Sequence, residues 1–423
     1  MSRSNKDFMS WIRGYVRNYA FLHVFLVTAC IFLPWWIKNG ANDESGIFAE
    51  LRQFGGEKCA SLPHTDSVFV IMKTGTTVLH KRLPVHLEST FKCIPDYIVY
   101  SDASESVHGL DIHDILSQID AEIKDQFPTE FALYNRLHGQ ESSTLSTNQG
   151  WKLDKWKFLP MMKSALGARP NAMWFIFIED DTAVVWSNLL HWLATHDPSE
   201  FYYFGRRQEV ANRPFAHGGS GFILSNPALR KAVMYLMPRM NQYFNLTMQM
   251  SYGDISTGWM LEDSGVSLID TWPSFQGENP GKLQYTEQIW CRPVMTHHHM
   301  SPRDIASLWM LEQRTLLDRR DVEMGASLLH RDVFKALIRP KLVPQLENWD
   351  NGRGDERFAP TVSECQDLCI SDETCVQFRF TPETCRLSSY VRFGIPTEPR
   401  FEITSGWLPD RIDRLYGKFQ CRE

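Results

Sequence analysis

The sequence lacks a long basic run, internal repeats and low-complexity tracts. Its formal net charge is -6, and no stripe of Lys and Arg could follow a phosphate backbone, so nucleic acid is not expected as a partner. With 43% hydrophobic and 22% charged residues, the composition is that of an ordinary globular protein. A chain of 423 residues suits one large domain and a small one, because single hydrophobic cores stop growing at roughly 250–300 residues.

Long apolar runs are scarce, and the exception lies near the N-terminus. Segment 20–37 contains one His and no formal charge, and it is just long enough to span a bilayer. Basic residues precede it and acids follow, which predicts a cytoplasmic tail at 1–19, a signal anchor at 20–37 and a lumenal stem at 38–66. A cleaved signal peptide is the alternative, but Trp35 and Trp36 stand where small residues would be needed. We expect a single-pass type II protein of the Golgi or endoplasmic reticulum membrane.

Cysteine is concentrated near the C-terminus. One of the nine, Cys30, falls in the apolar segment, and the remaining even number is typical of lumenal disulfides. Five of the nine lie between Cys365 and Cys421, which predicts a small disulfide-rich module at 361–423. Free thiols in a cytosolic enzyme are the alternative. The glycosylation sequon at Asn245 agrees with the lumenal side but is a weak signal.

Short apolar runs alternate with helical stretches between 67 and 341, which predicts an α/β domain with a mostly parallel sheet. We expect strands at 68–72, 97–102, 174–178 and 221–225. A helix is predicted after the second strand from the spacing of Leu110, Ile112, Ile115, Leu116, Ile119 and Ile123. Segment 342–360 is rich in Pro, Gly, Asn and Asp, and is predicted to be a linker.

Three acids, Glu179, Asp180 and Asp181, follow the apolar strand 174–178 directly. Ligands of open α/β sheets collect at the carboxyl ends of strands, so this cluster lies where a site is expected. Carboxylate oxygens select a hard cation such as Mn²⁺ or Mg²⁺. The alternative is a solvated turn in which Asp181 or Thr182 caps the next helix.

Further candidates lie later in the chain. If 294–300 is a strand, His298 lies on one face and its two neighbours on the other, and one imidazole could complete a metal shell. This alternation disfavours zinc, and ordinary surface or core histidines remain an alternative. The loop Gly218–Gly221 would let backbone approach a ligand or let a turn adopt a positive φ. Asp254 could be a general base or a helix N-cap.

In this order, the segments resemble the fringe and core-1 β1,3-galactosyltransferase group, and most closely fungal family 31-like glycosyltransferases, over 67–341. The resemblance is carried by Met72-Lys73-Thr74, Tyr100-Ser101-Asp102, Glu179-Asp180-Asp181-Thr182, Gly218-Gly219-Ser220-Gly221, Gly253-Asp254-Ile255 and His297-His298-His299. Two positions depart from the family pattern: Glu179 replaces an Asp, and Gly253 replaces an Asp or Glu. The cysteine spacing of 361–423 resembles that of a PAN or apple module, and such modules bind carbohydrate or protein. The alternative is that this segment is only a stabilising cap.

The resemblance implies a nucleotide-binding domain of the glycosyltransferase-A type. Its expected activity is that of a metal-dependent, inverting hexosyltransferase, which moves a sugar from a UDP-linked donor to a glycan or glycoprotein hydroxyl in a β1,3 linkage. The implied metal ligands are Glu179, Asp181 and His298, with Mn²⁺ or Mg²⁺ as the ion. The implied catalytic base is Asp254, and the implied donor-binding residues are Lys73, Thr74, Asp102, Asp180, Gly218 and Gly219.

Two alternatives from other classes stay open. The chain could be a membrane-anchored glycan-binding or scaffolding protein that keeps the fold without turnover. It could also be a metal-dependent phosphoesterase or hydrolase, because acids and histidines build such sites too.

Overall fold

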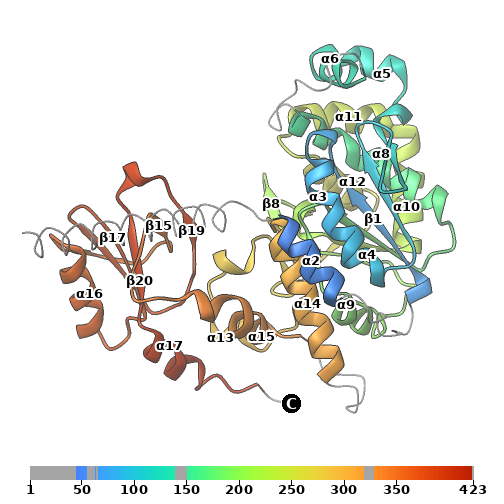
Figure 1. The fold of residues 1–423 in the computed structure, drawn as a ribbon. Coiled ribbons are helices and arrows are strands. Elements are labelled where there is room, and N and C mark those ends of the chain that lie inside the picture. The colour runs from blue at the N-terminus through green and yellow to red at the C-terminus, as the bar shows by residue number, and fades with distance from the viewer. Residues whose placement is uncertain (1–43, 55–61, 63–64, 139–149, 319–327, 422–423) are drawn as a thin grey trace, which may run out of the picture. The chain divides into compact units, whose positions relative to one another are not determined.

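The computed structural model describes residues 44–54, 62, 65–138, 150–318 and 328–421 (Figure 1). The chain divides into two units, 1–53 and 54–423. The first unit contributes most of α2 (Glu44–Phe54). Within the described part of the chain, no helix is both long enough and apolar enough to cross a bilayer. The predicted cytoplasmic tail at 1–19 and signal anchor at 20–37 lie outside the described residues.

An eight-stranded sheet forms the centre of the second unit, in the order β11-β7-β10-β5-β1-β2-β4-β3. Its strands are β1 (Val68–Lys73), β2 (Tyr97–Ser101), β3 (Glu105–Val107), β4 (Leu110–Asp114), β5 (Trp174–Glu179), β7 (Tyr203–Gly205), β10 (Phe222–Ser225) and β11 (Leu268–Asp270). Only β10 and β3 run antiparallel to their neighbours. The structure thus confirms the predicted α/β fold with a mostly parallel sheet.

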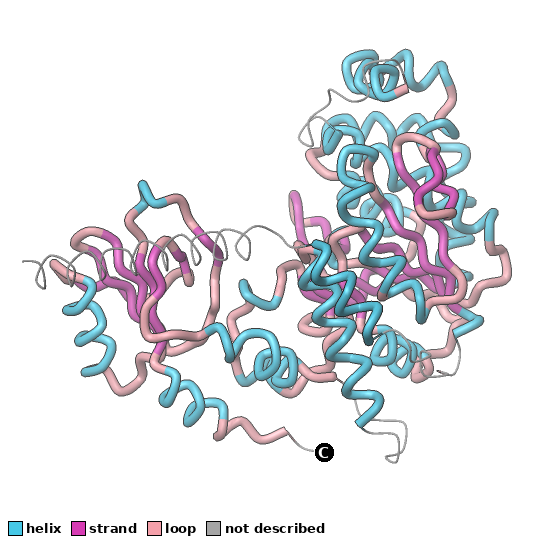
Figure 2. The backbone as a smooth tube through the Cα atoms, viewed as in Figure 1, coloured by secondary structure: helices cyan, strands magenta, loops and turns pink. Residues whose placement is uncertain are grey.

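Helices cover both faces of this sheet, as Figure 2 shows by its magenta strands between cyan helices. All six residues of β1 are buried: Phe69 and Ile71 join one apolar cluster, and Val68, Val70 and Met72 join another. The first cluster includes residues of α8 (Asp154–Ala168), α10 (Asn226–Leu236), α11 (Met240–Gln249) and α12 (Gly253–Asp263). The second includes residues of α3 (Thr76–Glu88) and α9 (Trp186–Leu193). A strand buried on both faces explains the continuous apolar run in the sequence.

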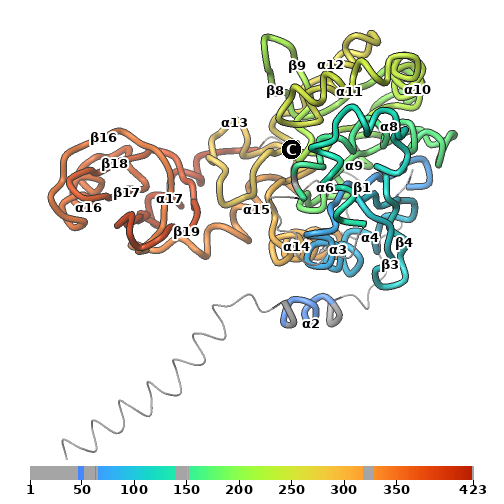
Figure 3. Tube along the Cα trace, turned by 90° about the horizontal axis from the view of Figure 1, so that it is seen from above, coloured from blue at the N-terminus to red at the C-terminus, as the bar shows by residue number. Residues whose placement is uncertain are grey.

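Several shorter elements complete the large domain. The short helices are α4 (Thr90–Cys93), α5 (Ala121–Gln126), α6 (Pro128–Leu137), α13 (Glu287–Trp290) and α15 (His330–Val333). A hairpin pairs β8 (Arg207–Val210) with β9 (Arg213–Ala216), and a small sheet contains β12 (Phe275–Gln276), β13 (Thr296–His297) and β6 (Ala183–Val184). The long α14 (Pro302–Asp318) lies beside α3 in both views (Figures 1 and 3).

The helix predicted from the apolar spacing at 110–123 is wrong. Leu110–Asp114 is strand β4, in which Ile112 is buried while Asp111 and His113 are exposed. A 3₁₀ turn (Leu116–Gln118) and α5 follow. The strand, the turn and the short helix each bury one or two apolar residues, and together these residues happen to lie three or four positions apart. The spacing alone therefore could not distinguish one continuous helix from these three elements.

A second, antiparallel sheet forms the C-terminal module, with α16 (Val362–Ser371) and α17 (Pro409–Tyr416). Its order is β14 (Leu346–Glu347), β20 (Thr404–Trp407), β17 (Gln377–Thr381), β18 (Thr384–Ser388) and β16 (Asp355–Phe358), and a further pair joins β15 (Trp349–Asp350) to β19 (Ile395–Pro396). Segment 342–360, predicted as a linker, therefore supplies three strands. Strands β14 and β15 have two residues each, and all four residues of β16 are exposed, so none of the three leaves a periodic pattern in the sequence.

Disulfides hold this module together and join it to the large domain. Cys365–Cys385 and Cys369–Cys375 lie within it, and Cys291–Cys421 connects it to the preceding domain. An apolar cluster includes Trp290 and Phe334 from the large domain together with Trp407 and Tyr416 from the module. These bonds confirm the predicted disulfides and exclude free thiols at these six positions.

One buried acid connects α14 to α9. Glu312 is only 2% exposed, and its Oε1 accepts hydrogen bonds of 2.7 Å from the backbone nitrogen and the hydroxyl of Ser187, in the first turn of α9. Burial raises the pKa of Glu312 to about 7, although the bonds from Ser187 oppose the rise. The folded protein therefore favours the protonated carboxyl.

We expect the melting temperature of Glu312→Gln, relative to that of the parent, to increase as pH rises from 5 to 8. A raised folded-state pKa means that the stability contributed by the protonated acid is complete below pH 4.5 and is lost as pH approaches about 7, whereas Gln does not titrate. Thermal melts of both proteins across this range test it, with the exposed Glu200→Gln as control. A difference that stays constant with pH would contradict the prediction.

Candidate active site

The ends of three parallel strands bring the candidate residues together. Lys73, the last residue of β1, lies opposite Tyr100 of β2 and Glu179 of β5. Thr74, Asp102 and the acidic turn after Glu179 therefore lie at the same edge of the sheet. This is the edge at which open α/β sheets bind their ligands.

Arg82 of α3 neutralises part of the acidic turn. Its Nη1 lies 2.7 Å from Oδ1 of Asp180 and 3.4 Å from Oδ2 of Asp181, and the Thr74 hydroxyl also donates to Asp180. Burial raises the pKa of Asp180 to about 6, with Arg82 acting in the opposite direction. The first turn of α9 begins only at Trp186, after β6, so the alternative in which Asp181 or Thr182 caps that helix is wrong.

Two buried lysines neutralise the other acids. Nζ of Lys157 lies 2.8 Å from Oδ2 of Asp102 and 2.7 Å from Oδ1 of Asp154. Nζ of Lys73 lies 3.4 Å from Oδ2 of Asp154 and 3.2 Å from Oε1 of Glu179. Burial opposes the charged form of Lys73, but Asp154 and Glu179 outweigh it and hold its pKa above the ordinary value. Asp102 is only 1% exposed, since Lys157 and Thr76 occupy its oxygens.

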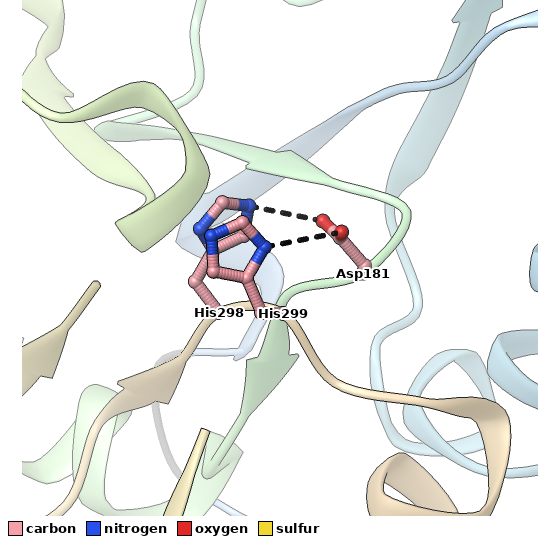
Figure 4. Close-up of side chains that lie close together, drawn as sticks. All are labelled: Asp181, His298 and His299. Carbon is pink, nitrogen blue, oxygen red and sulfur yellow. Dashed lines mark ion pairs between the residues drawn. The ribbon is translucent and has the colours of Figure 1, made fainter. Parts of the chain in front are cut away.

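Asp181, His298 and His299 form a group that could hold a metal ion. One potential ligand atom of each residue lies within 4.8 Å of the others. Oδ1 of Asp181 lies 3.1 Å from Nε2 of His298, and Oδ2 lies 3.9 Å from Nδ1 of His299. Figure 4 shows the two imidazoles stacked on each other, both facing the carboxylate. One carboxylate and two imidazoles are a donor set that divalent transition ions accept.

The protonation states of this group are interdependent. Burial alone would raise the pKa of Asp181. The hydrogen bond and charge of His298, together with the charge of Arg82, outweigh burial and lower this pKa to about 2. Burial alone would lower the pKa of His298, but Asp181 raises it above the ordinary value. Opposite charges therefore attract across the position where an ion would lie.

The predicted alternation of the three histidines is wrong. Strand β13 ends at His297, and His299 has a left-handed φ of 55°, so the chain turns and His298 and His299 share one side. His297 instead donates to the carbonyl of Glu278 and is fully buried, which lowers its pKa to about 4. Sequence reasoning missed His299 because it extended the strand through a turn.

Glu179 lies beside this group. Its Oε2 is 3.9 Å from Nε2 of His298, while Oε1 pairs with Lys73. Its assignment as a metal ligand stays a prediction.

The glycine loop lies directly against the metal group. A Cβ on Gly219 would lie 2.1 Å from Cε1 of His298, so only glycine fits beside this imidazole. The backbone nitrogen of Gly218 donates to Oδ2 of Asp254 at 2.8 Å. The loop therefore places both the imidazole and the carboxylate.

Asp254 lies in the first turn of α12 and is 7% exposed. Its N-cap alternative is wrong, since Tyr252 is the capping residue. Oδ1 is buried and has no hydrogen-bond partner among the described residues. Burial, helped by the charge of Glu179, raises the pKa of Asp254 to about 6, against the bond from Gly218.

A cavity of about 630 Å³ connects these groups. Its lining includes Asp254, Glu179, His298 and His299, together with the predicted donor-binding residues Lys73 and Gly219. The predicted site residues that are not part of the lining are Thr74, Asp102, Asp180, Asp181 and Gly218. Gly218 contacts the lining residue Asp254, whereas Thr74 bonds to Asp180 and Asp102 pairs with Lys157. The cavity is large enough for a small-molecule substrate.

Two positioning cations, Arg82 and Lys157, were missed by sequence reasoning. Both lie on helices that pack on the sheet, and each is far from its acid in sequence. The pair Asp154 and Lys157 at helical spacing was the available signal, but such pairs are common on exposed helices.

A family model described as Fringe-like matches residues 64–278. The match includes β1, β2, the acidic turn, the glycine loop and Asp254, and it ends before His298 and His299.

We expect Gly219→Ala to lower the affinity for Mn²⁺ at least tenfold, because the new methyl group displaces the imidazole of His298. Calorimetric titration with Mn²⁺ measures this. The control is Gly167→Ala, where a Cβ meets nothing within 4 Å and the helix gains about 0.5–1 kcal/mol. Equal Mn²⁺ affinity in both variants would contradict the placement of His298 in the metal group.

Proposed function

The chain belongs to the Fringe-like family, a family of glycosyltransferases, and we propose that its reaction is metal-dependent and inverting. The donor is a nucleotide sugar, UDP-linked in this proposal, and the acceptor is a hydroxyl of a glycan or glycoprotein, with a β1,3 product. One observation carries the proposal: Asp181 approaches His298 and His299, and these two imidazoles line the same cavity as Asp254.

The residues present fit a divalent ion. Asp181, His298 and His299 would hold Mn²⁺ or Mg²⁺, with Glu179 adjacent. The buried Nδ1 of His298 has no hydrogen-bond partner among the described residues. When bound, such an ion supplies positive charge that stabilises the departing nucleoside diphosphate.

The protein contributes the remaining groups for donor binding. Lys73 and Gly219 line the cavity and would contact the donor directly. Thr74, Asp102 and Asp180 would act by holding Arg82, Lys157 and Thr76 in place at the strand ends. Because these charged side chains are already in position, they need not move when charge develops in the transition state.

Asp254 is proposed as the catalytic base. Its Oδ1, which has no hydrogen-bond partner among the described residues, would take the proton of the acceptor hydroxyl while that oxygen bonds to the anomeric carbon. The bond from the anomeric carbon to the diphosphate breaks in the same step, and the diphosphate leaves with the electron pair. The amide of Gly218 fixes the other carboxylate oxygen, which orients the base.

We also propose a location in the secretory pathway, with a type II anchor at 20–37 in a Golgi or endoplasmic reticulum membrane. Three disulfides support an oxidising compartment. The C-terminal module is proposed to be PAN/apple-like, which is consistent with a helix, α16, stapled by Cys365–Cys385 to a five-stranded antiparallel sheet.

We expect Asp181→Ala to abolish sugar transfer and Mn²⁺-dependent UDP binding together, because the variant loses the only carboxylate in the metal group. A panel of nucleotide sugars assayed for hydrolysis and transfer, with calorimetry of UDP in the presence of Mn²⁺, measures both. The exposed Asp66→Ala is the control. Undiminished turnover in Asp181→Ala would refute the proposed metal role, whereas UDP binding without turnover in the parent would favour a binding protein.

Asp254→Asn should lower kcat by about 10²–10⁴-fold with little change in Mn²⁺-dependent UDP affinity, because the amide cannot accept the proton. In the parent, kcat/KM should rise with pH through about 6, since burial raises the pKa of Asp254 to that value and only the ionised form is a base. Rates measured from pH 5 to 8 at saturating Mn²⁺ test this. Activity that is flat over this range would argue against Asp254 as the base.

A further inference from the structure

A second cavity, of about 360 Å³, lies at the C-terminal module and is strongly basic. Five cationic side chains and one carboxylate line it, together with two glycines and an isoleucine: Lys282, Arg353, Arg379, Arg386, Arg392, Asp350, Gly352, Gly394 and Ile395. The net charge of the whole chain is -6, so this concentration of positive charge is local.

Two of the arginines are directly opposite each other on adjacent strands. Arg379 of β17 pairs in register with Arg386 of β18. Like charges in this arrangement destabilise a sheet. Oδ1 of Asp350 lies 2.8 Å from Nε of Arg379, and Oε2 of Glu356 lies 2.8 Å from Nη2 of Arg386. The positive charge of each guanidinium is therefore partly neutralised. Nε of Arg386 is nevertheless buried and has no hydrogen-bond partner among the described residues.

The other arginines add uncompensated charge. Neither Arg353 nor Arg392 forms an ion pair within the described part of the chain. Arg392 donates through Nε to the carbonyl of Lys282 and packs closely on Gly352, whose added Cβ would lie 3.0 Å from its Nη1. Gly352 also has a φ of +105°, so a side chain there would strain the backbone as well as crowd Arg392.

The basic cavity and the active-site cavity are lined by residues that are close together in the chain. Glu278 lines the active-site cavity, Lys282 lines the basic cavity, and the two side chains form an ion pair of 3.1 Å. Four residues of chain span at most about 14 Å, so one extended molecule of a few sugar units could reach both cavities.

We infer that the basic cavity binds an oxyanion, a carboxylate or sulfate ester, carried by an acidic glycan whose reactive hydroxyl lies in the active-site cavity. The inference rests on the proposed function and names the class of its acceptor. Guanidinium groups suit it because their planar donors match carboxylate and sulfate oxygens in pairs. A bound oxyanion also removes the repulsion between Arg379 and Arg386.

The test measures binding of defined saccharides to the full chain by calorimetry. The probes are a galacturonic acid tetrasaccharide, a neutral galactose tetrasaccharide of equal length, and inorganic sulfate and phosphate. The variants are Arg353→Glu and Arg386→Gln, and thermal melts are used to check that each is folded. The matched control is Arg357→Glu, an exposed arginine of β16 that does not line the cavity.

We expect the acidic tetrasaccharide to bind the parent at least tenfold more tightly than the neutral one, and Arg353→Glu and Arg386→Gln each to weaken it about tenfold or more. Arg357→Glu should change the affinity less than twofold. Equal binding of both tetrasaccharides, equal loss in the control, or inorganic sulfate or phosphate binding as tightly as the acidic tetrasaccharide would overturn the inference.

Mn²⁺-dependent UDP binding, measured on the same samples, separates this inference from the proposed function. It should be unchanged in Arg353→Glu and Arg386→Gln, because neither residue lines the active-site cavity. Loss of acidic-glycan binding with UDP binding intact therefore concerns the basic cavity alone.

Discussion

The arrangement at the carboxyl edge of the sheet depends on how buried acids are neutralised. Asp102, Asp180 and Asp181 are each less than 10% exposed, and ionised carboxylates at such depth are costly unless cations lie beside them. Lys157 and Arg82 provide that charge, and Lys73 does the same for Glu179. Because each cation comes from a different element, the strand ends, α3 and α8 are fixed relative to one another. The charges of the site are thus in place before any substrate arrives.

Sequence reasoning succeeded where a local pattern had one structural solution. The apolar runs at 68–72 and 174–178 could only be buried strands, and the acids that follow Ile178 had to lie at the carboxyl edge. The glycine loop was predicted to approach a ligand or to adopt a positive φ; Gly221 has a φ of 78°, and Gly219 lies against His298. The convergence of Asp181 with His298 was expected from the resemblance, and the geometry agrees with it.

Sequence reasoning failed where the outcome depended on contacts distant in the chain. The end of β13 at His297 is set by its pairing with β6 and β12, which no local pattern encodes, so His299 was not expected near Asp181. Arg82 and Lys157 look like ordinary helix-surface cations until the sheet is placed beneath them. The strands at 346–358 were missed because they are short and their partners lie about 30 to 60 residues further on.

The disulfide Cys291–Cys421 and the aromatic cluster around Trp290 and Tyr416 have an architectural consequence. Cutting the chain before the C-terminal sheet would leave the rings of Trp290, Tyr285 and Phe334 facing water. The module is therefore not an independent domain joined to the enzyme by a flexible linker. A substitution that loosens the packing of the module is therefore expected to disturb the part of the large domain that contains Trp290 and Phe334 as well.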